Sequence, residues 1–301
     1  MTPRAHPAAP AALAVLLLLA GLLGGSVIAA RVTLDHGTSV PTAVAVRSFA
    51  TAAVVGALCL WCRVPTKVTP RQGRTLTGIG VLLAAQSLCL YGAVRQIPVG
   101  LAVLAFNTYP LWIALAARLL YGDRPGRAVL WAMPVILAGL ALALDSAVPL
   151  AGSASAADWL PFTLGVGTAL AASFLYALAL VLTQHEVAAL DGRLRSAATL
   201  LVAGSIAAGA TWASQGPLWP ADATGWWALS AMSLLYGSAI TALFTVLPRL
   251  GVVGSSPVLS VEPVVAMGLA WLLLGQHLGL HQLGGALLVV AAVMALGLRK
   301  R

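Results

Sequence analysis

Residues 252–274, VVGSSPVLSVEPVVAMGLAWLLL, form a run of 23 residues that contains a single charge, Glu262. A helix rises about 1.5 Å per residue, so a run of this length matches the roughly 30 Å hydrocarbon core of a bilayer. The stretch therefore predicts a membrane-spanning helix with one carboxylate near the middle of the membrane.

Nine other apolar segments of similar length occupy the rest of the chain, with short connections between them. Together they predict an all-α polytopic membrane protein with ten transmembrane helices. The expected spans are residues 9–30, 40–62, 75–94, 98–120, 128–146, 159–182, 196–215, 226–247, 252–274 and 281–298. The first apolar run is longer than that of a cleaved signal peptide, so we expect it to be retained.

The composition favours the same class. Of 301 residues, 60% are hydrophobic and 8% are charged, against about 25% charged residues in a typical soluble domain. So few charges exclude a soluble enzyme, a disordered protein and a disulfide-stapled secreted domain. The net charge of +9 is not accompanied by Lys/Arg clusters interleaved with aromatic residues, so we expect no nucleic-acid partner.

The basic residues sort to one side of the membrane when the N-terminus is placed in the cytoplasm. Of 17 Lys and Arg residues, 14 then lie in cytoplasmic segments, Arg31 and Arg95 lie outside, and Arg47 lies within a helix. An excess of basic residues is typical of cytoplasmic loops. The preference for Arg over Lys is typical of a GC-rich bacterial genome. We therefore expect a multi-pass protein of the bacterial inner membrane with both termini in the cytoplasm.

The second half of the chain repeats the first when it is shifted by 153 residues. Matched positions include one proline pair and two glycine pairs: Pro110 with Pro263, Gly122 with Gly275, and Gly126 with Gly279. The repeats, residues 1–150 and 151–301, would each hold five helices, and an odd number makes them enter the membrane in opposite directions. Inverted repeats are typical of transporters, whose site lies near the midplane between the repeats.

Several motifs resemble those of the EamA family of the drug/metabolite transporter superfamily. Residues 260–278, SVEPVVAMGLAWLLLGQHL, resemble the family pattern "EP…AWLLLGExL", and residues 282–285, QLGG, resemble its "QxxG". Pro41 through Arg47 to Ala50 resembles the "P…R…A" pattern of the second helix. Gly25-Ser26 resembles the family's "WGS" in the first helix, but Gly24 stands where the family has Trp. The "GE" with which the family ends the ninth helix is Gly275-Gln276 here.

The resemblance covers nearly the whole chain in two family-type domains. It implies ten helices, a central cavity and the movement of a small organic solute, usually outward. Members of the family handle amino acids, other metabolites and drugs, and the resemblance does not choose among these.

Glu262 is the leading candidate for substrate binding and proton coupling. It lies about ten residues into its helix, and a carboxylate at that depth is costly and marks a functional site by default. Pro263 predicts a helix kink, because its ring removes one backbone bond and can leave a carbonyl free for a ligand. The alternative is that Glu262 is a hydrogen-bonded bridge between helices that never exchanges a proton.

Arg47 lies about seven residues, or roughly 10 Å, inside the outer end of its helix. It can neutralise an anionic substrate or pair with Glu262. An arginine this close to an interface can also extend toward it or cap carbonyls. We favour a structural or charge-pair role for Arg47.

Polar residues accompany the matched proline in both halves. Asn107 and Tyr109 precede Pro110, a second predicted helix kink, as Ser260 and Glu262 precede Pro263. We expect these residues to form paired walls of the cavity, with hydrogen bonding between helices as the alternative for Asn107. Further cavity candidates are polar residues within spans, although a serine often bonds only its own helix: Ser256, Tyr176, Tyr236 and Gln86. His185, Glu186 and Asp191 fall in a predicted loop and are expected to be solvated.

The sequence favours a secondary transporter that exports a small metabolite or drug. No nucleotide-binding motif supports ATP as the energy source, and we expect no cofactor, no metal and no catalytic residue. The alternatives are an intramembrane enzyme, which would need clustered catalytic groups, and a non-transporting membrane scaffold. Expected partners are the lipid bilayer and a small-molecule substrate, with the protein a monomer or homodimer.

Overall fold

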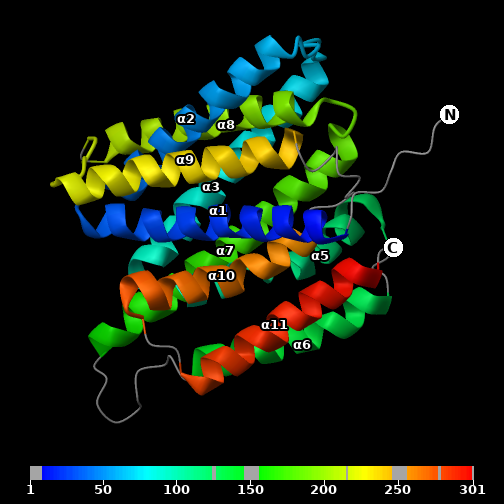
Figure 1. Ribbon diagram of the computed structural model, residues 1–301. Coiled ribbons are helices and arrows are strands. Elements are labelled where there is room, and N and C mark those ends of the chain that lie inside the picture. The colour runs from blue at the N-terminus through cyan, green and yellow to red at the C-terminus, as the bar shows by residue number, and fades with distance from the viewer. Residues whose placement is uncertain are drawn as a thin grey trace.

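The computed structural model describes residues 9–123, 127–145, 156–214, 216–245, 256–276 and 279–299. Side chains are described over residues 17–123, 130–143, 159–214, 216–242, 262, 265–276 and 279–292. Within these ranges the regular elements are all helices and there is no strand (Figure 1).

The helices follow one another along the chain with short connections. They are α1 (Ala9–Asp35), α2 (Val40–Trp61), α3 (Pro70–Gln96), α4 (Val99–Phe106), α5 (Tyr109–Tyr121), α6 (Arg127–Asp145), α7 (Ala156–Glu186), α8 (Gly192–Ala213), α9 (Ala223–Thr245), α10 (Ser256–Leu274) and α11 (Leu280–Arg299). The outer bounds of the predicted spans agree with these helices to within five residues. Apolar length is set by local composition, which is why the sequence alone places the helices well.

Six stretches of the described chain are long and apolar enough to cross a membrane. They are Leu17–Asp35, Val40–Trp61, Pro70–Gln96, Val99–Tyr121, Trp159–Glu186 and Gly192–Ala213. The described apolar parts of α6, α10 and α11 are shorter: Leu130–Ala143, Val265–Leu274 and Leu280–Ala292. The described part of the chain is thus helical throughout its regular structure and has the apolar spans of a membrane protein.

The fourth predicted span is two helices rather than one. Its interruption lies between Phe106 and Tyr109, next to Pro110, which lacks the N–H of a continuous helix. The Asn107 side chain donates to the Val103 carbonyl at 2.8 Å, and the Thr108 hydroxyl donates to the Ala105 carbonyl at 2.8 Å. The same two carbonyls also accept the backbone N–H groups of Asn107 and Thr108, so the side chains reinforce the last turn of α4. In the second half, α10 runs unbroken through Pro263.

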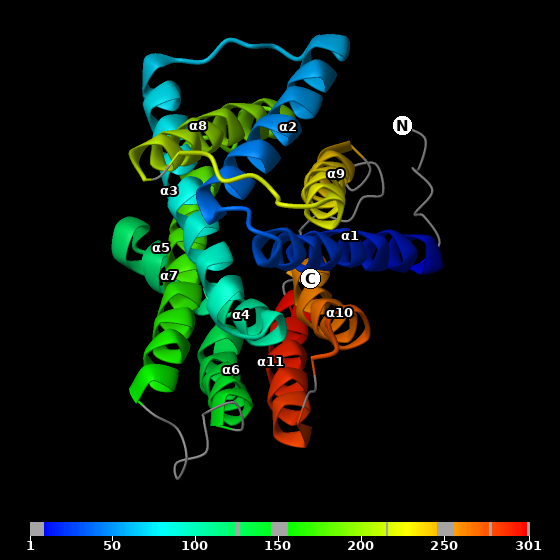
Figure 2. The same ribbon diagram turned by 90° about the vertical axis from the view of Figure 1, so that its left-hand side faces the viewer.

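Helices of the two halves alternate in space. The most extensive contacts pair α3 with α7, α2 with α8, α6 with α11 and α1 with α9, and each pair joins the first half to the second. Figures 1 and 2 show α2 and α8 at one edge of the bundle and α6 and α11 at the opposite edge. When α4 and α5 count as one segment, each segment of the first half has a counterpart five segments later in the second half. Replacing every helix by its counterpart turns these four pairs into the same four pairs.

The bundle has two ends, which we name after their connections. The α7–α8 end is the one at which residues 187–191 join α7 to α8, and the α1–α2 end is the one at which residues 36–39 join α1 to α2. At the α1–α2 end, Arg31 Nη1 of α1 donates to the Val94 carbonyl of α3 at 2.6 Å. Near α9, Asp222 Oδ2 lies 2.7 Å from His36 Nδ1. The Gly225 N–H and His36 together hold the pKa of the Asp222 carboxyl below its usual range.

The edge pair formed by α6 and α11 depends on a backbone contact between two glycines. A Cβ placed on Gly285 would lie 2.7 Å from the backbone nitrogen of Ala143 and closer still to the carbonyl oxygen of Gly139. Small residues of this kind let helices approach within a membrane, where apolar burial alone supplies no driving force between them.

The substitution Gly285→Ala tests this contact. We expect it to lower the thermal unfolding midpoint in detergent, because overpacking costs about 1–3 kcal/mol. The matched control is Gly268→Ala in α10, where an added Cβ would meet nothing within 4 Å. Equal midpoints for the two variants would contradict the importance of the glycine contact.

Candidate functional site

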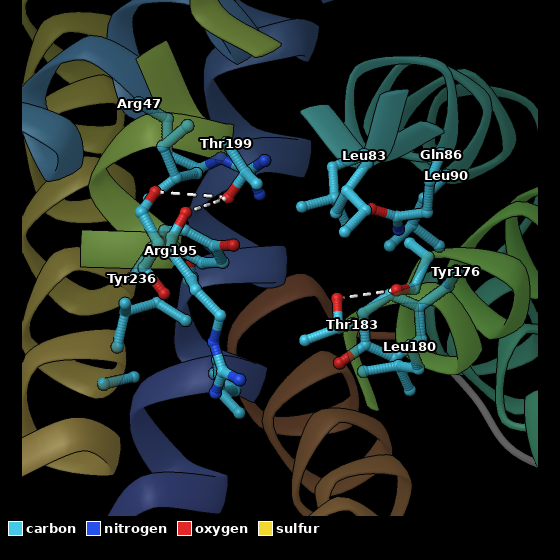
Figure 3. Close-up of a pocket in the computed structure, with 18 of the residues that line it drawn as sticks. Arg47, Leu83, Gln86, Leu90, Tyr176, Leu180, Thr183, Arg195, Thr199 and Tyr236 are labelled. Carbon is cyan, nitrogen blue, oxygen red and sulfur yellow. Dashed lines mark hydrogen bonds between the residues drawn. The ribbon is translucent and has the colours of Figure 1, made fainter. Parts of the chain in front are cut away.

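A cavity of about 380 Å³ runs from the middle of the bundle to the α7–α8 end. Residues from α1, α2, α3, α4, α7, α8, α9 and α10 line it, so both halves of the chain contribute. Its volume is within the range of about 300–1,000 Å³ that is usual for small-molecule sites. Figure 3 shows Arg47, Arg195, Thr199 and Tyr236 on one side, facing Leu83, Gln86, Tyr176 and Thr183 on the other.

The cavity wall is mostly apolar, with polar groups at separate points. Leu19, Leu23, Leu76, Ile79 and Leu83 are among the apolar lining residues. At the α7–α8 end the wall includes Gln184, which is exposed, so the cavity reaches the surface there.

Several residues singled out from the sequence line this cavity. They are Glu262, Tyr176, Tyr236, Gln86 and Arg47. They come from five different helices, and the fold brings them around one space.

Asn107 and Tyr109, which we expected in the wall, are not among its lining residues. Both are buried, and the Asn107 amide caps α4 instead of facing the cavity. The Tyr109 ring contacts Phe106 and Tyr176 at centroid distances of 5.9 and 5.4 Å. Because those two rings do line the cavity, Tyr109 lies directly behind its surface. The side chains of Ser256, Ser260 and Pro263 lie outside the described residues.

Arg47 is 6% exposed and is held by neutral groups. Its Nη1 donates to the Tyr91 hydroxyl and its Nη2 donates to Ser87 Oγ, each at 2.8 Å. Its Cζ lies 4.1 Å from the centroid of the Tyr236 ring and 5.0 Å from that of Tyr91, so the cation also contacts two aromatic faces. Within the described chain, no carboxylate oxygen lies within 4.0 Å of it, and its Nε has no partner.

Glu262 is 8% exposed, and no described side chain forms a hydrogen bond or ion pair with it. Its position depends on α10, which packs closely on α1, where a Cβ on Gly24 would lie 3.2 Å from the Ala266 nitrogen. The carboxylate is therefore not the other half of an ion pair with Arg47.

Arg195 lines the cavity, although we did not single it out from the sequence. Its Nη1 donates to the Val187 carbonyl at 3.1 Å, at the α7–α8 end. A repeat in the sequence could have identified it: residues 47–51 are RSFAT and residues 195–199 are RSAAT. With a shift of 148, Arg47 corresponds to Arg195 and Ser48 to Ser196, one on α2 and the other on its partner α8.

His185, Glu186 and Asp191 were expected to be solvated loop residues, but each of them bonds other side chains of the protein. α7 continues to Glu186, whose carboxylate accepts from Arg71 Nη2 and the Tyr121 hydroxyl, each at 3.0 Å. His185 Nε2 lies 3.0 Å from Asp123 Oδ2, and its ring stacks on Tyr121. These bonds join α3, α5 and α7 into one wall at the end where the cavity opens.

Asp191 caps the first turn of α8. It accepts from the Arg193 backbone N–H at 2.9 Å and bonds the Arg193 guanidinium, which holds the pKa of its carboxyl below the usual range. This cap fixes the start of the helix that carries Arg195 into the cavity wall.

Comparisons with known proteins agree with this architecture. Residues 11–144 and 163–298 each match the model of a family described as the EamA-like transporter family. A solved structure titled "Crystal structure of protein" is similar in fold, with a TM-score of 0.62 and 18% sequence identity over 95% of this chain and 97% of that chain. No curated protein matches the chain.

Two corresponding serines test where the cavity opens. With Cys59, Cys62 and Cys89 replaced by serine, we expect Ser196→Cys to react rapidly with a hydrophilic maleimide, because Ser196 lines the cavity. Ser48→Cys is the matched control and should react slowly, because Ser48 is 0% exposed. Labelling followed by mass spectrometry measures both rates, and similar rates would contradict the described cavity.

Proposed function

Because the chain belongs to the EamA-like transporter family, we propose that it is a secondary transporter that carries a small organic solute out of the cell by alternating access. The solute class proposed is an amino acid, a related metabolite or a drug. The single observation that carries this proposal is the cavity lined by both halves, which holds Arg47 and Glu262 in mostly apolar walls.

We propose further that the chain crosses the bacterial inner membrane ten times, with α4 and α5 sharing one span and both termini in the cytoplasm. Residues 1–150 and 151–301 would then be the two inverted repeats. In this orientation the α7–α8 end is cytoplasmic. The cavity would therefore face the cytoplasm, which is the state that receives a solute for export.

The alternation of helices limits how the protein can move. Since α1 packs on α9, α2 on α8 and α3 on α7, neither sequence half can rock as a separate body without breaking these contacts. We propose that the moving units combine helices of both repeats. The wall of α3, α5 and α7 joined by Glu186 is one candidate for such a unit.

Transport itself is tested by counterflow in proteoliposomes with a panel of amino acids and drugs, each with and without a pH gradient. We expect at least one solute to exchange across the membrane through the purified protein, in contrast to empty liposomes. Failure to move any solute in the panel would favour the scaffold or enzyme alternatives.

Proton coupling is tested with Glu262→Gln. We expect this variant to retain solute exchange by counterflow and to lose accumulation driven by a pH gradient, because the amide cannot exchange a proton. Asp35→Asn is the control, since Asp35 is an exposed carboxylate that pairs with Arg31 at the α1–α2 end. Full gradient-driven accumulation by Glu262→Gln would rule out a coupling role for this residue.

A further inference from the structure

The charged groups of the cavity are unbalanced in favour of positive charge. Among its described lining residues are two guanidinium groups, Arg47 and Arg195, and one carboxylate, Glu262. A buried cation is stabilised mainly by a paired anion, and Arg47 has only hydroxyl groups and aromatic faces around it. Two of its five N–H donors are used in these bonds. The planar guanidinium matches a carboxylate in charge and shape.

The tyrosines around Arg47 also belong to the internal repeat. Residues 90–92 and 235–237 are both Leu-Tyr-Gly, so Tyr91 of α3 corresponds to Tyr236 of α9. One ring comes from each repeat, and both contact the same guanidinium. Each repeat therefore contributes one corresponding arginine and one corresponding tyrosine to the wall of one cavity, and in the state seen here both tyrosines contact Arg47.

We propose that the cavity binds the carboxylate of a solute with an apolar body, on Arg47 in the state seen here and on Arg195 when the cavity opens at the α1–α2 end. This inference rests on the proposed function and narrows its substrate class. Arg47 is now at the closed end of the cavity and Arg195 is near its mouth. An inverted repeat that exchanges the conformations of its two halves also exchanges these two environments, so each arginine becomes the deep one in turn.

The remaining wall fits the rest of such a solute. Leucine and isoleucine side chains cover much of the surface, which suits an aliphatic body. Glu262 faces the same cavity and is available to an ammonium group where the solute has one. Both an apolar amino acid and a simple organic acid share the carboxylate that this inference requires.

The first experiment compares three probes with the same aliphatic body. These are L-leucine; L-leucinamide, in which an uncharged amide replaces the carboxylate; and 4-methyl-2-oxopentanoate, which has the carboxylate but lacks the ammonium group. In thermal-shift titrations of the purified full chain at millimolar ligand, we expect both acids to stabilise the protein. We expect the amide to bind about 10- to 100-fold more weakly, the range given by loss of a charged hydrogen bond.

The matched variants are Arg47→Gln, Arg47→Lys and Arg95→Gln. We expect Arg47→Gln to lose acid binding and Arg47→Lys to keep part of it, because lysine retains the charge without the planar fork. Arg95 is exposed and is not a cavity residue, so its variant should bind like the parent. Equal binding of the amide, unchanged acid binding by Arg47→Gln, or no stabilisation by either acid would overturn the inference.

The two acid probes distinguish the source of the carboxylate. Tighter binding of leucine supports an amino acid whose ammonium group adds a contact, and equal binding supports a simple organic acid. Acid binding by a protein that moves no solute of the counterflow panel would overturn the proposed transport and leave the carboxylate site standing. Transport of leucinamide as fast as leucine would overturn the carboxylate site and leave the proposed transport standing.

The second experiment tests the exchange of arginines in vesicles of known orientation. Half-saturation constants for counterflow of the bound acid are measured from each side of the membrane. We expect Arg47→Gln to raise the constant most on the α7–α8 side and Arg195→Gln to raise it most on the α1–α2 side. An Arg195→Gln variant with an unchanged constant on the α1–α2 side would overturn the exchange.

Discussion

Each half of this chain packs its helices mainly against helices of the other half. The pairs α1–α9, α2–α8 and α3–α7 bring together segments that lie far apart in sequence. In a membrane such contacts depend on close shape matching, because lipid competes equally well for apolar surface. This is why glycines stand where backbones meet, as at Gly139 and Gly285. The cavity lies among helices of both halves and reaches the surface at the α7–α8 end.

Burial of Arg47 explains the arrangement of its neighbours. A guanidinium taken out of water needs donors of electron density around it, and Tyr91, Ser87 and Tyr236 supply them from α3 and α9. Neutral groups compensate less of the lost hydration than a carboxylate would. A permanent carboxylate partner would, however, compete with any anionic solute. The incomplete compensation is therefore what a binding site for an anion requires.

The sequence predicted the helices more completely than the site. Span positions follow from apolar length, a local property, and Pro110 marked the place where the fourth span is interrupted. The cavity wall is a tertiary property: Gln86, Tyr176, Tyr236 and Glu262 line it, whereas Asn107 turns to the Val103 carbonyl. Periodicity could not distinguish these cases, because polar residues in membrane helices bond either their own backbone or another group.

Arg195 shows a different limit. The repeated Arg-Ser-x-Ala-Thr motif is visible in the sequence, but the shift of 148 that reveals it differs from the 153 that aligns Pro110 with Pro263. Connections of unequal length change the register between helices. A single shift along the whole chain therefore hides correspondences that lie outside one aligned block.

The internal symmetry is incomplete at the position of the proposed coupling residue. Tyr109 corresponds to Glu262, so the arginines are duplicated and the carboxylate is not. An anion site can pass from one repeat to the other as the cavity changes sides, but a single carboxylate has no counterpart to replace it. In the proton-coupled cycle proposed above, Glu262 must therefore serve both states itself. Water favours a charged carboxylate and an apolar wall favours a neutral one. A change in the hydration of Glu262, or the arrival of a cationic group of the solute beside it, can therefore drive its proton exchange.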